Sequence, residues 1–101
     1  MLVAFSVAPA VAADDTGSVS EAVAAAIRVV RESGLPNRTD SMFTTLEGGW
    51  DEVMAVVKGA VDAVAAASPR VSLVLKADIR PGFTGELEAK VARIDDLLAG
   101  G

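Results

Sequence analysis

Residues 42–49, which read Met-Phe-Thr-Thr-Leu-Glu-Gly-Gly, constrain the fold more than any other stretch of the chain. The first six residues have the length and β-branched content of a strand. This strand carries Thr44, Thr45 and Glu47 where an ordinary core strand would carry apolar residues. Two glycines end it, and the acidic start of a helix follows directly at Trp50. A polar strand that leads at once into a helix is the first place to look for a site.

The segments around this strand alternate between strand and helix periodicity. Strands are predicted over 2–8, 37–41, 42–47 and 71–79, and helices from Ser18 to just before Gly34, over 50–67 and over 86–98. Ser18 and Glu21 form a capping box, and Thr84 is the predicted cap of the last helix. The polar segment 37–41 reads as a loop by periodicity alone. It is assigned to an edge strand because the fold needs one there, with a hairpin turn around Asp40 and Ser41.

The resulting order is β-α-β-β-α-β-α. Two right-handed βαβ units joined by a central hairpin predict an α+β fold, the ferredoxin-like split β-α-β-β-α-β antiparallel sheet, with an extra C-terminal helix. The expected strand order is 4-1-3-2, with two helices on one face of the sheet and the other face bare. A length of 101 residues fits one domain, so residues 1–101 are expected to form a single domain.

Missing residue types exclude several classes of chemistry. The chain has no Cys, no His and no Tyr, which rules out Ser-His-Asp and Cys-His catalysis and any Cys-ligated metal. We therefore expect no enzyme activity, no metal site and no cofactor. The least favoured alternative is an enzyme that uses Asp40 or Glu47 as a base. The net charge of −5 with scattered basic residues argues against nucleic-acid binding.

The apolar N-terminal segment has two readings. Residues 2–13 end in Ala-Val-Ala-Ala like a signal-peptide cleavage site, but no Lys or Arg precedes them. Removal of this segment would also remove the first strand. We therefore expect a cytoplasmic protein. No apolar run approaches the roughly 20 residues of a membrane span, so no membrane association is expected.

A light core favours self-association. Aromatic residues make up 4% of the chain, and Ala and Val dominate its apolar half. Trp50 is expected in the core because it continues the apolar stripe of its helix. On the last strand, Lys76, Asp78 and Arg80 share the face away from the core, where an ion-paired contact between subunits explains them better than a ligand site does. A dimer or tetramer would cover the bare face.

The stretch Met42-Phe43-Thr44-Thr45-Leu46-Glu47-Gly48 resembles the YkoF-like thiamine-binding protein family. Three further pieces agree with that family: the first strand followed by Pro9, the helix end Ser33-Gly34-Leu35, and Arg70-Val71 followed by Lys76-Ala77-Asp78-Ile79-Arg80. The resemblance covers nearly the whole chain. It implies a ferredoxin-like fold, assembly into dimers or tetramers, and binding of thiamine or its hydroxymethylpyrimidine part without known catalysis.

Two positions depart from the family pattern. Ser41 stands where the family tends to have Pro, and Phe43 where it tends to have Gly, so a bulky side chain could reshape the pocket.

The predicted ligand-binding residues are hydroxyls, carboxylates and one aromatic ring around the polar strand. Hydroxyls can bond an aminopyrimidine, and carboxylates can accept from its exocyclic amine or favour the thiazolium cation. Simpler readings stay open: the threonines reflect β-propensity, Glu47 is a solvated strand end beside a helix start, and Ser6 allows close packing. Alternation also separates Thr45 and Glu47 from Thr44 and Leu46. The predicted set is Ser6, Asp40, Phe43, Thr44, Thr45 and Glu47.

These observations give one preferred function and one alternative. The preferred reading is a small-molecule binding protein, self-associating as a dimer or tetramer, that holds thiamine or hydroxymethylpyrimidine near the polar strand without covalent chemistry. The alternative is a ligand-free structural or regulatory module that acts through its exposed sheet.

Overall fold

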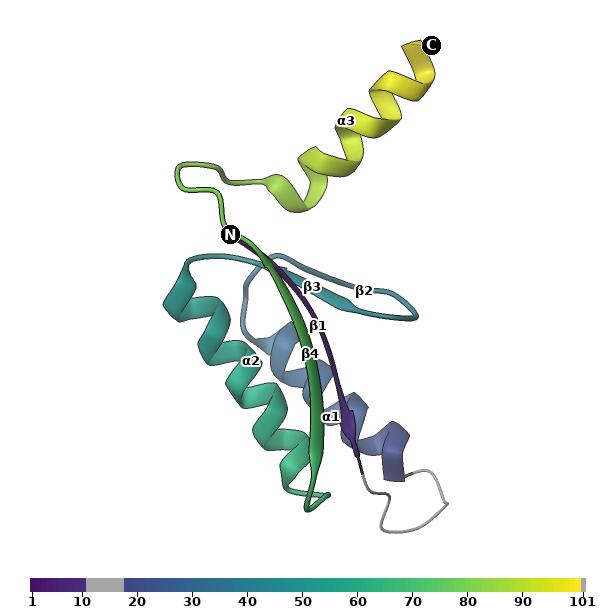
Figure 1. Cartoon of the computed structure of the whole chain (residues 1–101), viewed down its shortest axis with the longest axis vertical. Coiled ribbons are helices and arrows are strands. Elements are labelled where there is room, and N and C mark those ends of the chain that lie inside the picture. Colours follow the sequence, from purple (N-terminus) through teal and green to yellow (C-terminus); the bar gives the residue numbers. More distant parts are fainter. Residues whose placement is uncertain (11–17, 101) are drawn as a thin grey trace.

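The computed structural model describes residues 1–10 and 18–100 (Figure 1). These residues form four strands and three helices in the predicted order. The elements are β1 (Leu2–Pro9), α1 (Ser18–Glu32), β2 (Asn37–Thr39), β3 (Thr44–Glu47), α2 (Trp50–Ala65), β4 (Val71–Asp78) and α3 (Glu86–Gly100). Residues 11–17 and the side chain of Ser18, the predicted cap of α1, lie outside the described residues.

The four strands form one antiparallel sheet in the order β2-β3-β1-β4. This is the predicted order 4-1-3-2 counted from the opposite edge, and the α+β ferredoxin-like prediction is confirmed. The central strand β1 pairs with β4 from Leu2 to Pro9, but with β3 only from Leu2 to Phe5. Beyond Phe5, therefore, β1 has a strand neighbour on one side only among the described residues.

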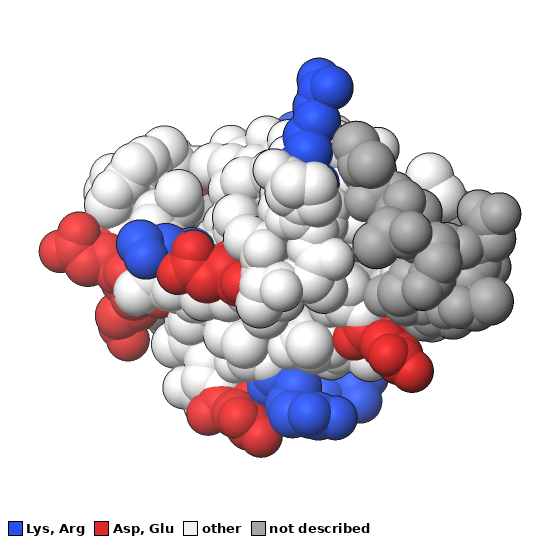
Figure 2. All heavy atoms as spheres, turned by 90° about the horizontal axis from the view of Figure 1, so that it is seen from below, with Lys and Arg blue, Asp and Glu red and all other residues white. Residues whose placement is uncertain are grey.

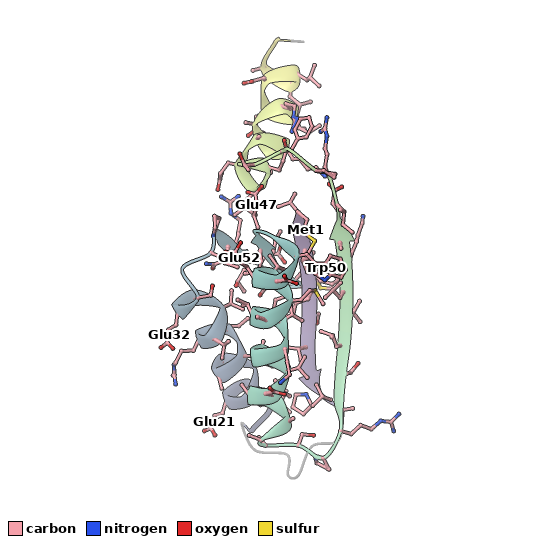
Figure 3. The ribbon with its side chains drawn as sticks, turned by 90° about the vertical axis from the view of Figure 1, so that its left-hand side faces the viewer. Met1, Glu21, Glu32, Glu47, Trp50 and Glu52 are labelled. Carbon is pink, nitrogen blue, oxygen red and sulfur yellow. The ribbon has the colours of Figure 1, made fainter. Side chains whose placement is uncertain are left out.

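The core lies between the sheet and the helices α1 and α2, which cover one face side by side (Figures 1 and 3). Valine and alanine make up most of it, as the composition suggests. Phe5 is its one aromatic member among the described residues. The buried apolar residues are Val3, Phe5, Val7, Ala22, Ala26, Val30, Leu46, Val53, Val57, Ala60 and Val64.

Gly59 lets α1 and α2 approach closely. A methyl group at this position would lie 3.0 Å from a side-chain carbon of Val29. Such a distance is shorter than ordinary van der Waals contact, so a larger residue would push the helices apart. Glycine in a helix interior costs about 1 kcal/mol relative to alanine, and close packing explains why it is tolerated here.

Trp50 is not in the core, contrary to the sequence prediction. Its side chain is 57% exposed. The buried stripe of α2 consists of Val53, Val57, Ala60 and Val64. Trp50 has the right spacing to continue this stripe, but it is the first residue of the helix, about one turn before Val53, the first buried position. Periodicity identifies a helix face, but it does not show how far the opposing sheet extends.

The third helix leaves the body of the molecule. In Figure 1, α3 projects from one end of the sheet, and the chain measures 51 Å along its longest axis. Every described residue from Val91 to the end of α3 is exposed. In the part of the chain that the structure describes, no helix has the length and apolarity needed to cross a membrane.

Candidate functional site

The polar strand β3 divides its side chains between the two faces of the sheet. Thr44 pairs with Phe5 and Leu46 pairs with Val3, and all four are buried on the side of α1 and α2. Thr45 and Glu47 point to the opposite face, as the predicted alternation requires. The polar side chains of β3 therefore lie on two opposite faces of the sheet and cannot all line one pocket.

A cavity of about 210 Å³, here called the edge cavity, lies where β3 begins. Four of the six predicted ligand-binding residues line it, namely Ser6, Asp40, Phe43 and Thr44. The other lining residues come from β1, from α1 and from the hairpin between β2 and β3; they are Phe5, Val7, Ala8, Val23, Ile27, Thr39, Ser41 and Met42. The cavity thus joins an apolar floor to a polar rim, as small-molecule sites commonly do.

Asp40 shapes the hairpin at the mouth of the edge cavity. Its Oδ1 accepts hydrogen bonds from the backbone amides of Met42 (2.8 Å) and Phe43 (2.9 Å), and its own amide donates to the carbonyl of Phe43 (2.9 Å). The bonds from Phe43 and Met42 lower the pKa of Asp40. Its second oxygen has no partner among the described residues, so a negative charge with free acceptor capacity stands at the rim.

Thr44 brings a buried hydroxyl to the same cavity. The hydroxyls of Thr44 and Thr39 lie 3.1 Å apart and share a hydrogen bond. Each hydroxyl has one donor and two acceptor positions, so the pair keeps capacity for a ligand. Ser6, Val7 and Ala8 of β1, which pair with β4 but not with β3 among the described residues, line the cavity as well. Ser6 does so although alternation places its side chain on the sheet face away from α1 and α2.

Thr45 and Glu47 lie away from the edge cavity. The carboxylate of Glu47 accepts hydrogen bonds from the backbone amides of Glu86 (2.8 Å) and Leu87 (3.2 Å), the first residues of α3. Figure 3 shows Glu47 directly below this helix. Its side chain is 7% exposed. A residue from β3 thus caps a helix about forty positions later, and the prediction that Thr84 caps α3 is wrong.

A larger cavity than the edge cavity, about 540 Å³ and here called the root cavity, flanks the first turn of α3. Its walls come from the body on one side and from the start of α3 on the other. They are Leu35, Pro36, Asn37, Glu47, Gly48, Thr84, Gly85, Leu87 and Glu88. Sequence reasoning identified only Glu47 in this set. The other residues come from the loop before β2, from the start of β2, from Gly48 after β3, and from α3 and the loop before it. No local pattern connects these segments, and only the position of α3 brings them together.

Charged side chains are interspersed on the surface. Figure 2 views the end of the molecule opposite α3, and there Lys and Arg side chains lie among Asp and Glu rather than in one patch. On the face away from α1 and α2, Lys90 of α3 hydrogen-bonds to Asp78 of β4 and lowers the pKa of that carboxyl. Within residues 1–10 and 18–100, no group of three or more Asp and Glu residues is arranged to hold a metal ion.

The fold and the edge cavity together define a ferredoxin-like domain with a small pocket at one edge of its sheet. The sequence model of the thiamine-binding protein family matches residues 3–95, and the chain belongs to this family. It is 57% identical over 99 residues to a UPF0045 protein of Mycobacterium bovis, covering 97% of this chain and 94% of that protein. A UPF0045 protein of Synechocystis is 34% identical over 82 residues, covering 80% and 68%.

Solved structures support the same assignment. A hypothetical protein of Methanocaldococcus jannascii superposes with a TM-score of 0.80 at 31% identity, over 93% of this chain and 94% of that chain. A candidate thiamine biosynthesis/salvage protein of Thermotoga maritima superposes with a TM-score of 0.73 at 27% identity, over 90% and 96%. The resemblance inferred from the β3 segment is therefore confirmed.

Proposed function

We propose that this protein binds thiamine or its hydroxymethylpyrimidine part in the edge cavity, without catalysis. The observation that supports this most is the convergence of Ser6, Asp40, Phe43 and Thr44 on one cavity. Membership of the thiamine-binding protein family adds to it. These residues come from two strands and a hairpin, so their convergence is a property of the fold and not of one sequence motif.

The chemistry of the cavity suits an aminopyrimidine. Val7, Ile27 and neighbouring apolar side chains offer a floor for a flat ring. The buried hydroxyl of Thr44 can donate to or accept from a ring nitrogen. An aspartate of ordinary pKa is already ionised at neutral pH, and the lowered pKa of Asp40 favours the ionised form further. Its free oxygen can therefore accept from an exocyclic amine or attract a cation.

The size of the cavity favours the smaller ligand. Sites for drug-sized ligands measure about 300–1,000 Å³, and the edge cavity measures about 210 Å³. The pyrimidine ring of thiamine would occupy the cavity, and the thiazolium would lie at the mouth near Asp40. Phe43, which stands where the family tends to have glycine, occupies part of that mouth. We therefore expect hydroxymethylpyrimidine to bind at least as tightly as thiamine.

Two matched variants on one strand test the location. Thr44→Val removes a hydroxyl from the edge cavity, and Thr45→Val makes the same change on the opposite face. In titration calorimetry with hydroxymethylpyrimidine, Thr44→Val should weaken binding about tenfold, the loss of one neutral hydrogen bond. Thr45→Val should leave the Kd unchanged. Equal effects of both variants, or no heat of binding to the folded wild type, would remove the proposal.

A third variant tests the size argument. Phe43→Gly opens the mouth of the edge cavity and should strengthen thiamine binding more than hydroxymethylpyrimidine binding. Phe83→Gly, a change of the same size at an exposed position outside the cavity, is the control. If Phe43→Gly weakens both ligands equally, Phe43 contributes stacking contact rather than obstruction.

The alternative function, a module that acts through self-association, has an observation of its own. Large apolar side chains are exposed along α3 and on the sheet: Val74 is 56% exposed, Ile94 56%, Leu97 72% and Leu98 75%. Such clusters on small proteins mark surfaces for association. We propose that the chain forms dimers or larger assemblies. Analytical ultracentrifugation at decreasing concentration tests this, and a monomer at micromolar concentration would refute it.

A further inference from the structure

The edge cavity has one charged residue, Asp40, among the described residues that line it. The other lining residues carry apolar side chains or hydroxyls. Asp40 is exposed at the hairpin, whereas the hydroxyl-bearing Thr44 is only 3% exposed. The cavity is therefore polar but uncharged in its interior and negatively charged at its mouth.

No basic side chain offsets this charge. None of the Lys and Arg residues is among the described residues that line the edge cavity, and residues 11–17 contain neither type. Arg38 lies two positions before Asp40 but on the sheet face away from α1 and α2, because it pairs with Thr45. Its guanidinium forms a salt bridge at 2.5 Å with Glu88 of α3. In the part of the chain that the structure describes, Asp40 thus has no salt-bridge partner.

The carboxylate of Asp40 is held in place at the mouth. Its Oδ1 accepts hydrogen bonds from the backbone amides of Met42 and Phe43, and its own amide donates to the carbonyl of Phe43. The bonds from the two amides also lower the pKa of the carboxyl. A ligand that enters the edge cavity therefore meets a negative charge at a fixed position.

The compounds related to thiamine differ in the charge that they would bring to this position. One methylene group on the pyrimidine ring carries the thiazolium cation in thiamine, a neutral hydroxyl in hydroxymethylpyrimidine, and a phosphate of charge about −1.5 to −2 in hydroxymethylpyrimidine phosphate. With the ring inside the edge cavity, this methylene points to the mouth. The carboxylate of Asp40 then attracts the first group and repels the third.

From these observations, we propose that the edge cavity selects unphosphorylated ligands and that Asp40 is the residue that excludes their phosphate esters. This inference rests on the proposed function and specifies which chemical forms of the ligand the site accepts. The protein then holds the compound before, and not after, a phosphoryl group is attached to it. Thiamine phosphate carries its phosphate on the far side of the thiazolium, so its exclusion is weaker.

Titration calorimetry with free and phosphorylated ligands measures this selection. At low salt, the wild-type chain should bind hydroxymethylpyrimidine phosphate about five- to tenfold more weakly than hydroxymethylpyrimidine, as expected for a phosphate about 6 Å from one exposed carboxylate. Thiamine phosphate should bind about two- to threefold more weakly than thiamine. Raising the salt from about 20 mM to about 500 mM should reduce both ratios, because salt screens exposed charges.

The variant Asp40→Asn removes the charge but keeps an oxygen that can accept from the two amides. Whatever its effect on hydroxymethylpyrimidine itself, it should bring the Kd ratio of the phosphate ester to the free compound close to one. It should also weaken thiamine relative to hydroxymethylpyrimidine about threefold, because the attraction for the cation is lost. As the matched control, Asp51→Asn makes the same change at an exposed position of α2 outside the edge cavity and should leave every ratio unchanged.

Three results would overturn the inference, and they are distinguishable from one another. If the wild-type chain binds hydroxymethylpyrimidine phosphate as tightly as hydroxymethylpyrimidine, or more tightly, the site does not exclude phosphate, although the proposed function stands. If Asp40→Asn leaves the ratio unchanged, the exclusion comes from the shape of the mouth and not from this charge. If the folded wild-type chain gives no heat with hydroxymethylpyrimidine, the proposed function is removed and this inference with it.

Discussion

The helices α1 and α3 have the same length, 15 residues, and both have an apolar stripe, yet they have opposite environments. Ala22, Ala26 and Val30 of α1 are buried against the sheet, together with the stripe of α2. Ile94 and Leu98 of α3 remain more than half exposed. The comparison teaches that an amphipathic pattern specifies a helix and its apolar face. It does not specify whether the surface that covers this face belongs to the same chain.

The contrast between the buried core and the exposed helix α3 is tested most directly by the same substitution in each region. Leu46→Ala, at a fully buried position, should lower the free energy of unfolding by about 2–5 kcal/mol, because it leaves a cavity in the core. Leu98→Ala on α3 should change it by no more than about 0.5 kcal/mol in the dilute monomer. Urea denaturation at low protein concentration measures both. Similar losses would show that α3 is part of the folded core.

A second test concerns the close packing that α3 lacks. Gly59→Leu should destabilise the protein by about 1–3 kcal/mol, because its side chain would collide with Val29 where α1 and α2 meet. Ala55→Leu, at an exposed position of the same helix, serves as the control and should be nearly neutral. Urea denaturation gives both values. A neutral Gly59→Leu would indicate that the two helices can separate without cost.

A third test addresses the contact between β3 and the start of α3. Glu47→Ala removes the acceptor for the first two amides of α3 and should cost about 0.5–2 kcal/mol, the usual value of a helix cap. Hydrogen exchange followed by NMR should show faster exchange at Glu86 and Leu87, with β1 unchanged. Glu52→Ala, which removes an exposed carboxylate from the start of α2, is the comparison. Equal loss of protection in β1 would mean that Glu47 stabilises the body as a whole.

The smallest effect is expected at the tip of the hairpin between β2 and β3, which is exposed like the outer part of α3. The pKa of Asp40 is lowered from its ordinary value of 3.8 by bonds from Phe43 and Met42. Because the folded value is the lower one, these bonds stabilise the hairpin fully above the unfolded pKa, and their contribution is lost as the pH falls through the folded pKa. NMR titration of the Met42 and Phe43 amides should show this transition, and Asp40→Asn should abolish it. A midpoint at or above 3.8 would contradict the assignment.

Much of the fold was predictable because its signals are local. The alternation of Val3, Phe5 and Val7 identified β1 despite the resemblance of this segment to a signal peptide. The start of β3 was placed two residues early, because Asp40 uses the amides of Met42 and Phe43 to form a turn. Sequence proximity also grouped Thr44, Thr45 and Glu47 in one predicted site. The pleat of the strand places Thr44 on one face and the other two on the opposite face.

The sequence by itself determined the order of elements and the antiparallel split β-α-β-β-α-β fold, because periodicity and turn residues act over a few positions. The family followed from a resemblance carried by residues 42–48 and three other short segments. Only the tertiary structure decided which polar side chains of β3 share a cavity, that Glu47 caps α3, and that Trp50 and the apolar residues in the outer part of α3 remain exposed. The shared cavity and the cap depend on contacts between segments that lie about 35 to 40 residues apart, and such contacts leave no periodic trace in the chain.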